Sequence, residues 1–231
     1  MIRRRAKICG VTTVDDALAA VRCGADAIGL NFHPPSPRFI TEAIAREIIA
    51  ALPPFVEPAL LSVNEEWNNI LDRVARLPES RLVQVHGDRL TPPPLGADIR
   101  WIPAFSVRDD ASLLAIRKFL EECRASGARM PSAVLVDAHV PGQFGGTGQV
   151  APWDLLRGFA PGIPLVLAGG LTPDNVFAAI ETLRPYAVDV ASGVESSPGR
   201  NFVASTSRPR TSRIAFVYSV RFRRCKPGGG R

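Results

Sequence analysis

Four side chains capable of catalysis or anion binding stand where short apolar runs of the sequence end. Cys9, His86 and Asp137 each close such a run, and Arg38 follows another. A thiol and a carboxyl group on opposite sides of one cavity can act as a general base and a general acid, provided that burial and neighbours tune their pKa values. This chemistry uses neither a metal nor a cofactor, and we expect neither here. The residue types therefore favour acid–base catalysis by Cys9 and Asp137.

Each of these residues also has a plainer interpretation. Cys9 could be a small buried hydrophobic residue, and Asp137 could cap a loop or pair with a surface arginine. The fork of Arg38 suits a carboxylate, but a surface ion pair would use it as well. We expect His86 to be a hydrogen-bonded loop residue more than an acid or base. Lys7 shares a strand face with Cys9, and it either lowers the pKa of that thiol or pairs elsewhere.

Glycine-bearing segments in the second half of the chain indicate a phosphate site. They cover residues 145–148, 168–170 and 191–193, and each follows an apolar run. Glycines just past buried strands let backbone N–H groups approach an anion, and a following helix adds its positive end. One such segment alone would be a tight turn that needs a positive φ. Three of them at strand ends favour a phosphate ester as the ligand.

The elements that must position these groups alternate along the chain. Apolar runs that lack the alternation of a half-exposed sheet predict strands covered on both faces. These strands are expected at 6–9, 27–32, 58–63, 82–86, 100–105, 133–137, 165–168 and 187–191. Apolar residues at helical spacing predict helices at 13–23, 41–52, 64–77 and 110–125. A further helix to Leu183 is expected to begin with Thr172 as its N-cap and Pro173 as its first residue.

This order predicts an α/β protein, a single (β/α)8 TIM barrel whose active site lies at the C-terminal ends of the strands. At 231 residues and 46% hydrophobic content, the chain can bury one substantial core. We expect the barrel body to span residues 1–199 and an atypical basic tail, disordered or frame-shifted, to span residues 200–231. The tail holds nine Lys or Arg and no acid, which leaves the body with a net charge of −3. Its apolar residues from Ile214 to Phe222 recur every second position, so it does not supply the expected last helix.

Several classes of protein are excluded or disfavoured by composition. No apolar run approaches the roughly 20 residues that span a bilayer, and the basic start lacks a signal-peptide core, so we expect a cytoplasmic protein without a membrane partner. The four cysteines form no CxxC pair, which argues against a zinc site or a disulfide framework. A basic tail can bind nucleic acid, but an unselected or frame-shifted extension explains it more simply. We therefore do not expect nucleic acid as a partner.

Motifs spread over residues 5–199 resemble the phosphoribosylanthranilate isomerase family, whose members act in tryptophan biosynthesis. Each motif is weak alone, and their order and spacing together carry the resemblance. They are Lys7–Thr12, Gly29–Phe32 with Ser36–Arg38, Val83–Gly87, Leu135–Ala138, Gly145–Gly148, Leu167–Leu171 and Asp189–Glu195.

The resemblance implies an Amadori rearrangement of N-(5-phosphoribosyl)anthranilate to 1-(o-carboxyphenylamino)-1-deoxyribulose 5-phosphate. It implies that Asp137 protonates the ring oxygen of the sugar, that Cys9 removes the proton from the adjacent carbon, and that Arg38 holds the anthranilate carboxylate. It also implies a phosphate site made by backbone amides, and these surround Gly146, Gly169, Gly170, Ser192 and Gly193.

We expect a small-molecule phosphoribosyl substrate and a monomer or a homodimer. The alternatives are another phosphosugar TIM-barrel enzyme, such as an epimerase or indole-glycerol-phosphate synthase, and a non-catalytic protein whose basic tail binds nucleic acid. The three histidines form no obvious metal-binding cluster of the kind that an epimerase would need.

Overall fold

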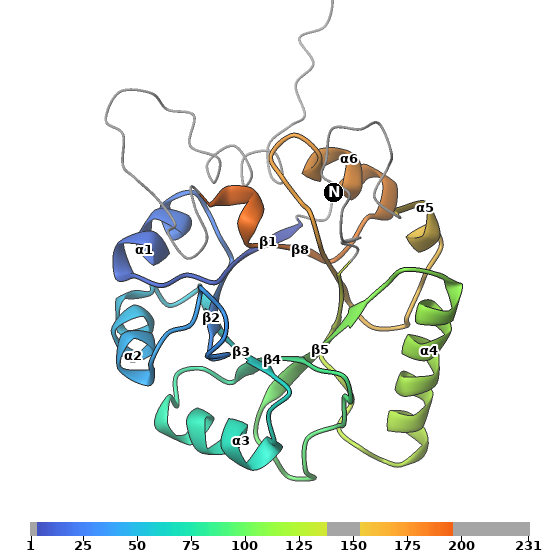
Figure 1. Cartoon of the computed structure of the whole chain (residues 1–231), viewed down its shortest axis with the longest axis horizontal. Helices are drawn as coiled ribbons and strands as arrows, with labels where there is room; N and C mark the ends of the chain where they lie inside the picture. Colours follow the sequence, from blue (N-terminus) through green and yellow to red (C-terminus); the bar gives the residue numbers. More distant parts are fainter. Residues whose placement is uncertain (1–3, 138–152, 196–231) are drawn as a thin grey trace, which may run out of the picture.

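Eight parallel strands close into a barrel, and the helices form a ring around it (Figure 1). The computed structural model describes residues 4–137 and 153–195. The strands are β1 (Arg5–Cys9), β2 (Ala27–Asn31), β3 (Glu57–Val63), β4 (Leu82–His86), β5 (Arg100–Ser106), β6 (Val134–Asp137), β7 (Leu165–Ala168) and β8 (Ala187–Val190). The helices are α1 (Val14–Arg22), α2 (Glu42–Ala51), α3 (Trp67–Arg76), α4 (Asp110–Ala125), α5 (Trp153–Leu156) and α6 (Val176–Leu183), and a 3-10 turn, η1 (Ser192–Val194), follows β8. All eight predicted strands are confirmed to within one residue at either end.

The predicted helices are also present, and side chains at their first turns explain where most of them begin. The hydroxyl of Thr13 accepts a hydrogen bond from the Asp16 backbone nitrogen at the start of α1, and the carboxylate of Asp109 accepts one from Ser112 at the start of α4. Such N-caps satisfy backbone donors that have no partner within the helix. Each helix then packs an apolar stripe on the outer face of the strands, where Ile8 is fully buried.

The prediction for the start of α6 was wrong. The helix begins at Val176 and not at Pro173, because the side chain of Asn175 organises a turn first. Its oxygen accepts from the Thr172 backbone nitrogen at 2.8 Å, and its nitrogen donates to the Gly170 carbonyl oxygen at 2.8 Å. Asparagine favours such side-chain-to-backbone turns over helix interiors.

The connection between β4 and β5 departs from the strand–helix alternation of a regular barrel. Residues 87–99 join these two strands without a helix. They include Pro92, Pro93 and Pro94, which lack backbone N–H groups and cannot continue a helix. The predicted boundary at residue 199 and the tail lie outside the described residues.

The interior of the barrel combines small apolar residues with buried polar ones. A cluster separate from the outer core contains Ala104, Ala133, Ala168 and Ala187. Barrel interiors are usually filled by branched residues such as valine, isoleucine and leucine. Small side chains on these strands leave room for three longer polar ones, Lys7, Gln84 and Asp189, which are buried to at least 94%.

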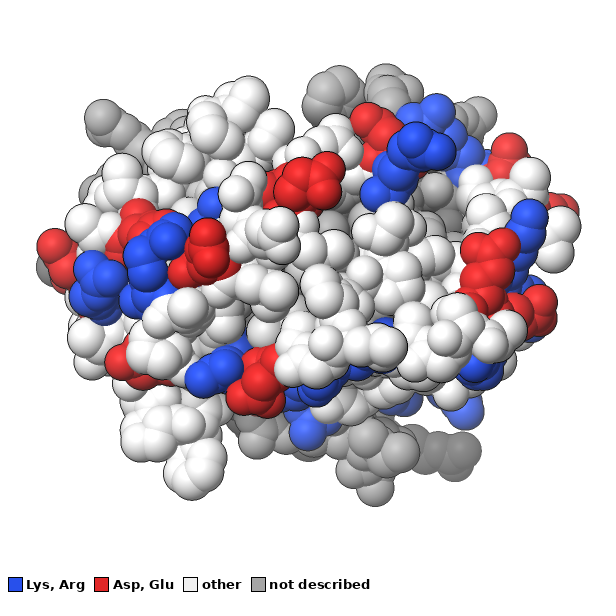
Figure 2. Space-filling view, turned by 90° about the horizontal axis from the view of Figure 1, so that it is seen from below, with Lys and Arg blue, Asp and Glu red and all other residues white. Residues whose placement is uncertain are grey.

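The surface of the described residues gives no sign of a membrane segment or of a large charged patch on the face that Figure 2 shows. No helix among those residues is long and apolar enough to cross a bilayer. On that face basic side chains lie mostly beside acidic ones (Figure 2).

Trp101 on β5 provides a test of the outer core. Its ring is fully buried and meets those of Trp67 and Phe119 edge to face, with centroids 5.8 and 6.0 Å apart. We expect Trp101→Ala to lower the free energy of unfolding by about 3–5 kcal/mol, because it removes this packing and leaves a cavity. Leu114→Ala on α4 is the control, since that side chain is 66% exposed, and it should change stability by no more than about 0.5 kcal/mol. Urea denaturation measures both, and similar losses for the two variants would contradict this description of the core.

Candidate functional site

The structure brings the side chains predicted from the sequence to one rim of the barrel. Cys9 ends β1, His86 ends β4 and Asp137 ends β6, while Arg38 lies in the segment that follows β2. In a parallel barrel the C-terminal ends of all strands share one rim, where the loops that carry chemistry are found. The rim that was predicted to hold the site therefore does hold these four residues.

Cys9 lies beside a buried ion pair inside the barrel. The Lys7 Nζ is 2.9 Å from Asp189 Oδ2, and both side chains are less than 10% exposed. The strand register explains this contact, because β1 pairs with β8 so that Lys7 lies directly opposite Asp189. The Lys7 ammonium and the Cys9 sulfur also lie around the same point, just above the α-carbon of Gly29, and Lys7 acts to lower the pKa of Cys9. The sequence analysis left open whether Lys7 lowers the pKa of the Cys9 thiol or pairs elsewhere. In the structure Lys7 pairs with Asp189 and also acts to lower the pKa of Cys9.

Gly29 on β2 supplies the space in which the sulfur and the ammonium meet. A Cβ atom at this position would lie 2.7 Å from Cys9 Sγ and 3.0 Å from Lys7 Nζ. The 2.7 Å contact is shorter than real Cβ atoms make and the 3.0 Å contact is unusually tight, so a side chain here would push the two groups apart. Gly29 pairs with Cys9 in the sheet, and a glycine is needed at this position because a side chain would occupy the space of the sulfur and the ammonium.

Burial dominates the electrostatics of this group. It raises the pKa of Cys9, because a thiolate loses its hydration inside the barrel; Lys7 opposes the rise and Asp189 adds to it. Burial also works against the charged form of Lys7, but Asp189 and Cys9 outweigh it, so the pKa of Lys7 is raised and the ammonium persists. The resting site therefore contains an ion pair beside a neutral thiol.

His86 connects this group to the other side of the barrel. Its Nε2 lies 2.8 Å from the amide nitrogen of Gln84. Because an amide nitrogen only donates, the ring nitrogen accepts, which requires a neutral imidazole. Burial lowers the pKa of His86 and Lys7 lowers it further, while Asp189 and Asp137 act in the opposite direction. The charges of Lys7 and Asp137 are thus both close enough to His86 to change its pKa.

Arg38 is held by a carboxylate that the sequence analysis had not assigned to it. The Arg38 Nε donates to Glu195 Oε1 at 2.6 Å, and Nη2 donates to the second oxygen. Glu195 follows η1, so this pair joins the segment after β2 to the segment after β8. The side chain of Arg38 lies against Gly10, where a Cβ atom would come within 2.2 Å of its Cδ. The plainer interpretation of Arg38 was a surface ion pair; Arg38 does form an ion pair, but its partner Glu195 is only 3% exposed.

Two of the three glycine-bearing segments lie next to each other. Gly169 and Gly170 follow β7, and both have a positive φ, at 91° and 61°. Ser192 and Gly193 begin η1 after β8. A Cβ atom at Gly193 would lie 1.8 Å from the carbonyl oxygen of Leu171, so the two loops are in direct backbone contact. Gly146, in the third segment, lies outside the described residues.

Asp189 is the residue that sequence analysis missed. An acid in the middle of β8, between Val188 and Val190, could have signalled a buried partner, because buried carboxylates are nearly always paired. Its Oδ1 has no hydrogen-bond partner among the described residues. Residues 4–137 and 153–195 contain no group of three or more metal-binding side chains.

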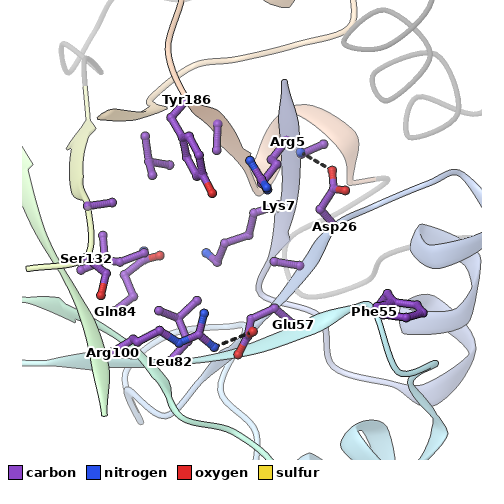
Figure 3. Close-up of a pocket in the computed structure, with 16 residues that line it drawn as sticks. Arg5, Lys7, Asp26, Phe55, Glu57, Leu82, Gln84, Arg100, Ser132 and Tyr186 are labelled. Atoms are coloured by element: carbon purple, nitrogen blue, oxygen red, sulfur yellow. Dashed lines mark hydrogen bonds and ion pairs between the residues drawn. The ribbon is translucent and has the colours of Figure 1, made fainter. Parts of the chain in front are cut away.

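A cavity of about 560 Å³ opens at the opposite rim (Figure 3), and neither Cys9 nor Asp137 is among the residues that line it. Residues at the starts of the strands form its mouth, among them Arg5, Arg100 and Glu57, and the last two are paired at 2.7 Å. Lys7 and Gln84 line its inner part, and the Lys7 side chain extends into it. These two residues therefore separate this cavity from the rim that carries Cys9 and His86.

Comparisons with known proteins identify the family of the chain. The family model described as N-(5'-phosphoribosyl)anthranilate (PRA) isomerase matches residues 6–201. A relative from Geobacter sulfurreducens named N-(5'-phosphoribosyl)anthranilate isomerase is 46% identical over 203 residues, which cover 87% of this chain and 93% of the relative. A solved phosphoribosyl anthranilate isomerase from Thermotoga maritima is 35% identical, with a TM-score of 0.77 over 94% of this chain and 98% of that one.

Two further solved structures bear on ligands and assembly. One is a phosphoribosyl anthranilate isomerase in complex with reduced 1-(o-carboxyphenylamino)-1-deoxyribulose 5-phosphate; it is 33% identical with a TM-score of 0.74, covering 94% of this chain and 98% of that one. Another contains monomers generated from the dimeric Thermotoga maritima isomerase; it is 32% identical with a TM-score of 0.73, over the same shares of the two chains. With the family model matched over most of its length, this chain belongs to the N-(5'-phosphoribosyl)anthranilate isomerase family.

Proposed function

We propose that the chain catalyses the Amadori rearrangement of N-(5-phosphoribosyl)anthranilate in tryptophan biosynthesis, with Cys9 as the general base and Asp137 as the general acid. The observation that carries the assignment is that the two residues end β1 and β6 at one rim. His86 ends β4 at the same rim, and the charges of both Lys7 and Asp137 shift its pKa. No step of this reaction needs a metal or an organic cofactor.

The proposed reaction begins with proton transfer from the carboxylic acid of Asp137 to the ring oxygen of the ribose. The C–O bond of the ring then breaks, and the anthranilate nitrogen becomes an iminium. Its positive charge acidifies the proton on the adjacent carbon, and the Cys9 thiolate removes that proton to give an enolamine. Tautomerisation of the enolamine gives the ketone of the product.

Arg38 is the proposed partner of the anthranilate carboxylate, and Glu195 is its positioning residue. Glu195 occupies Nε and Nη2 of the guanidinium. Nη1 has no hydrogen-bond partner within residues 4–137 and 153–195, and we propose that it donates to the substrate. A guanidinium held in this way loses little conformational entropy when the substrate binds.

The proposed phosphate site consists of the loops after β7 and β8, with Gly169, Gly170, Ser192 and Gly193. The contact between the two loops supports it, because loops at these places form phosphate sites in many barrels. Holding the phosphate at one end of the substrate fixes the reacting sugar against Asp137 and Cys9. Gly146 remains a proposed member of this site.

The assembly and the boundaries of the chain are further proposals. We propose a barrel body over residues 1–199, to which the basic tail at 200–231 contributes no catalytic group. The protein is proposed to act as a monomer or a homodimer, and the dimeric isomerase of Thermotoga maritima supports the second state.

Removing either catalytic group should abolish turnover. We expect Cys9→Ala and Asp137→Asn each to lower kcat by about 10²–10⁴-fold, which is the usual contribution of a positioned acid or base. The decrease of anthranilate fluorescence during conversion measures the rate, and circular dichroism checks that both variants fold. Cys123→Ala is the matched control, because that cysteine is buried on α4, and it should retain its turnover. Substantial turnover in purified Cys9→Ala would disprove the assignment of the base.

Loss of the guanidinium should weaken substrate binding more than it slows the chemical step. We expect Arg38→Ala to raise KM by about 10–100-fold, because hydrogen bonds to charged groups contribute about 1.5–3 kcal/mol. Arg38→Lys should recover little of this loss, since an ammonium cannot bind Glu195 through two parallel hydrogen bonds. Arg46→Ala serves as the control, because Arg46 is exposed and bonds only to a backbone oxygen. Steady-state kinetics measures KM for all three variants. A KM of Arg38→Ala as low as that of Arg46→Ala would refute the role of Arg38.

A further inference from the structure

The surroundings of Cys9 pose a physical problem for a general base. Cys9 is only 8% exposed, and burial raises the pKa of its thiol. A base must lose its proton before it can accept another, and a buried thiolate is unstable unless a cation or a hydrogen-bond donor compensates it. A group that supplies this compensation must lie close to the sulfur and keep its charge inside the barrel.

Lys7 is the cation that meets both conditions. Its ammonium nitrogen and the Cys9 sulfur both lie within 3.0 Å of the point that a Gly29 Cβ would occupy, and its charge favours the thiolate. An isolated buried lysine would lose its proton, because the charged form is strongly destabilised away from water. Asp189 prevents this with a carboxylate oxygen 2.9 Å from Nζ.

The remaining charged and titratable groups near the sulfur do not replace Lys7. Arg38 faces Cys9 from the segment after β2, but Glu195 binds it through two hydrogen bonds. His86 on β4 is neutral and faces Lys7, and Asp137 on β6 faces His86. Among the described residues, Lys7 is therefore the cation best placed to stabilise a thiolate at Cys9.

We infer that the buried Lys7–Asp189 pair is a positioning device for the base of the proposed isomerisation, in which Asp189 holds the Lys7 ammonium against the Cys9 sulfur and the ammonium stabilises the thiolate. This inference rests on the proposed function of Cys9. The two partners have opposite effects on the sulfur: the positive charge of Lys7 favours the thiolate, whereas the negative charge of Asp189 disfavours it. The pair as a whole is neutral, so most of the sulfur keeps its proton at neutral pH, and the fraction that has released it to solvent is the thiolate that acts as the base.

The test is a pH titration of the Cys9 thiolate by its ultraviolet absorbance, with the titration of Cys9→Ala subtracted. We expect Lys7→Gln to raise the midpoint by about one pH unit or more, because the sulfur loses its cation and its donor. Asp189→Asn should lower the midpoint by a similar amount, because the thiolate then replaces the carboxylate as the anionic partner of the Lys7 ammonium. Lys118→Gln is the matched control, since that lysine is 75% exposed and paired with Glu122 on α4, and its midpoint should not move.

Activity distinguishes this positioning role from simple damage to the barrel. The kcat of Lys7→Gln should fall about tenfold at neutral pH, recover as the pH rises through the new midpoint, and leave KM nearly unchanged. Lys7→Gln alone leaves the buried Asp189 carboxylate unpaired and could fail to fold for that reason. The double variant Lys7→Gln/Asp189→Asn removes both charges and covers this case. Its midpoint should lie between those of the single variants. Shifts of the two single variants in the same direction, or no shift in either, would overturn the inference. Failure of the proposed function would appear separately, as turnover retained by Cys9→Ala.

Discussion

Closure of the barrel between β1 and β8 is the constraint on which the site depends. The pairing of the first strand with the last places Lys7 opposite Asp189, although 182 positions separate them in the sequence. The same closure brings Glu195 to Arg38. Both ion pairs therefore exist only when the barrel is complete. A chain that left this seam open would lose the partner of a buried lysine and the partner of the arginine together.

The buried pair at this seam is better explained by function than by stability. Removing two charges from water costs free energy that their attraction often fails to recover, and apolar residues of similar size commonly serve a core as well or better. The neighbouring strands present small residues such as Ala168 and Ala187, which make room for the polar side chains and leave an open cavity behind them. An interior built for stability would fill this space with branched residues. We therefore attribute the buried Lys7–Asp189 pair to its role beside Cys9, where the lysine stabilises the thiolate.

The sequence predicted the elements well because their signals are local. Continuous apolar runs identified all eight strands, and apolar residues at helical spacing identified α1 to α4. The start of α6 was wrong because Pro173 suits both the first turn of a helix and the turn that precedes it, and the bonds of Asn175 decided between them.

The partners within the site depend on strand register and on contacts between distant loops, and local patterns do not contain this information. Cys9, His86, Asp137 and Arg38 could be assigned to one rim from their positions at strand ends. The sequence analysis left the partner of Lys7 open and did not anticipate that of Arg38. An acid within an apolar strand, as at Asp189, is the one local signal that pointed to a buried partner.

The proposed reaction also explains why a neutral ion pair beside a thiol can be preferable to an isolated cation. An unpaired lysine would hold the sulfur as a permanent thiolate, but it would also repel the iminium that forms when the sugar opens. With Asp189 in place, the pair carries no net charge and the sulfur ionises most readily when the substrate becomes cationic. The negative charge of the base then arises next to the positive charge of the intermediate, in a site where low polarity strengthens their attraction. The arrangement thus favours the transition state over the resting enzyme, which is the condition for a gain in rate.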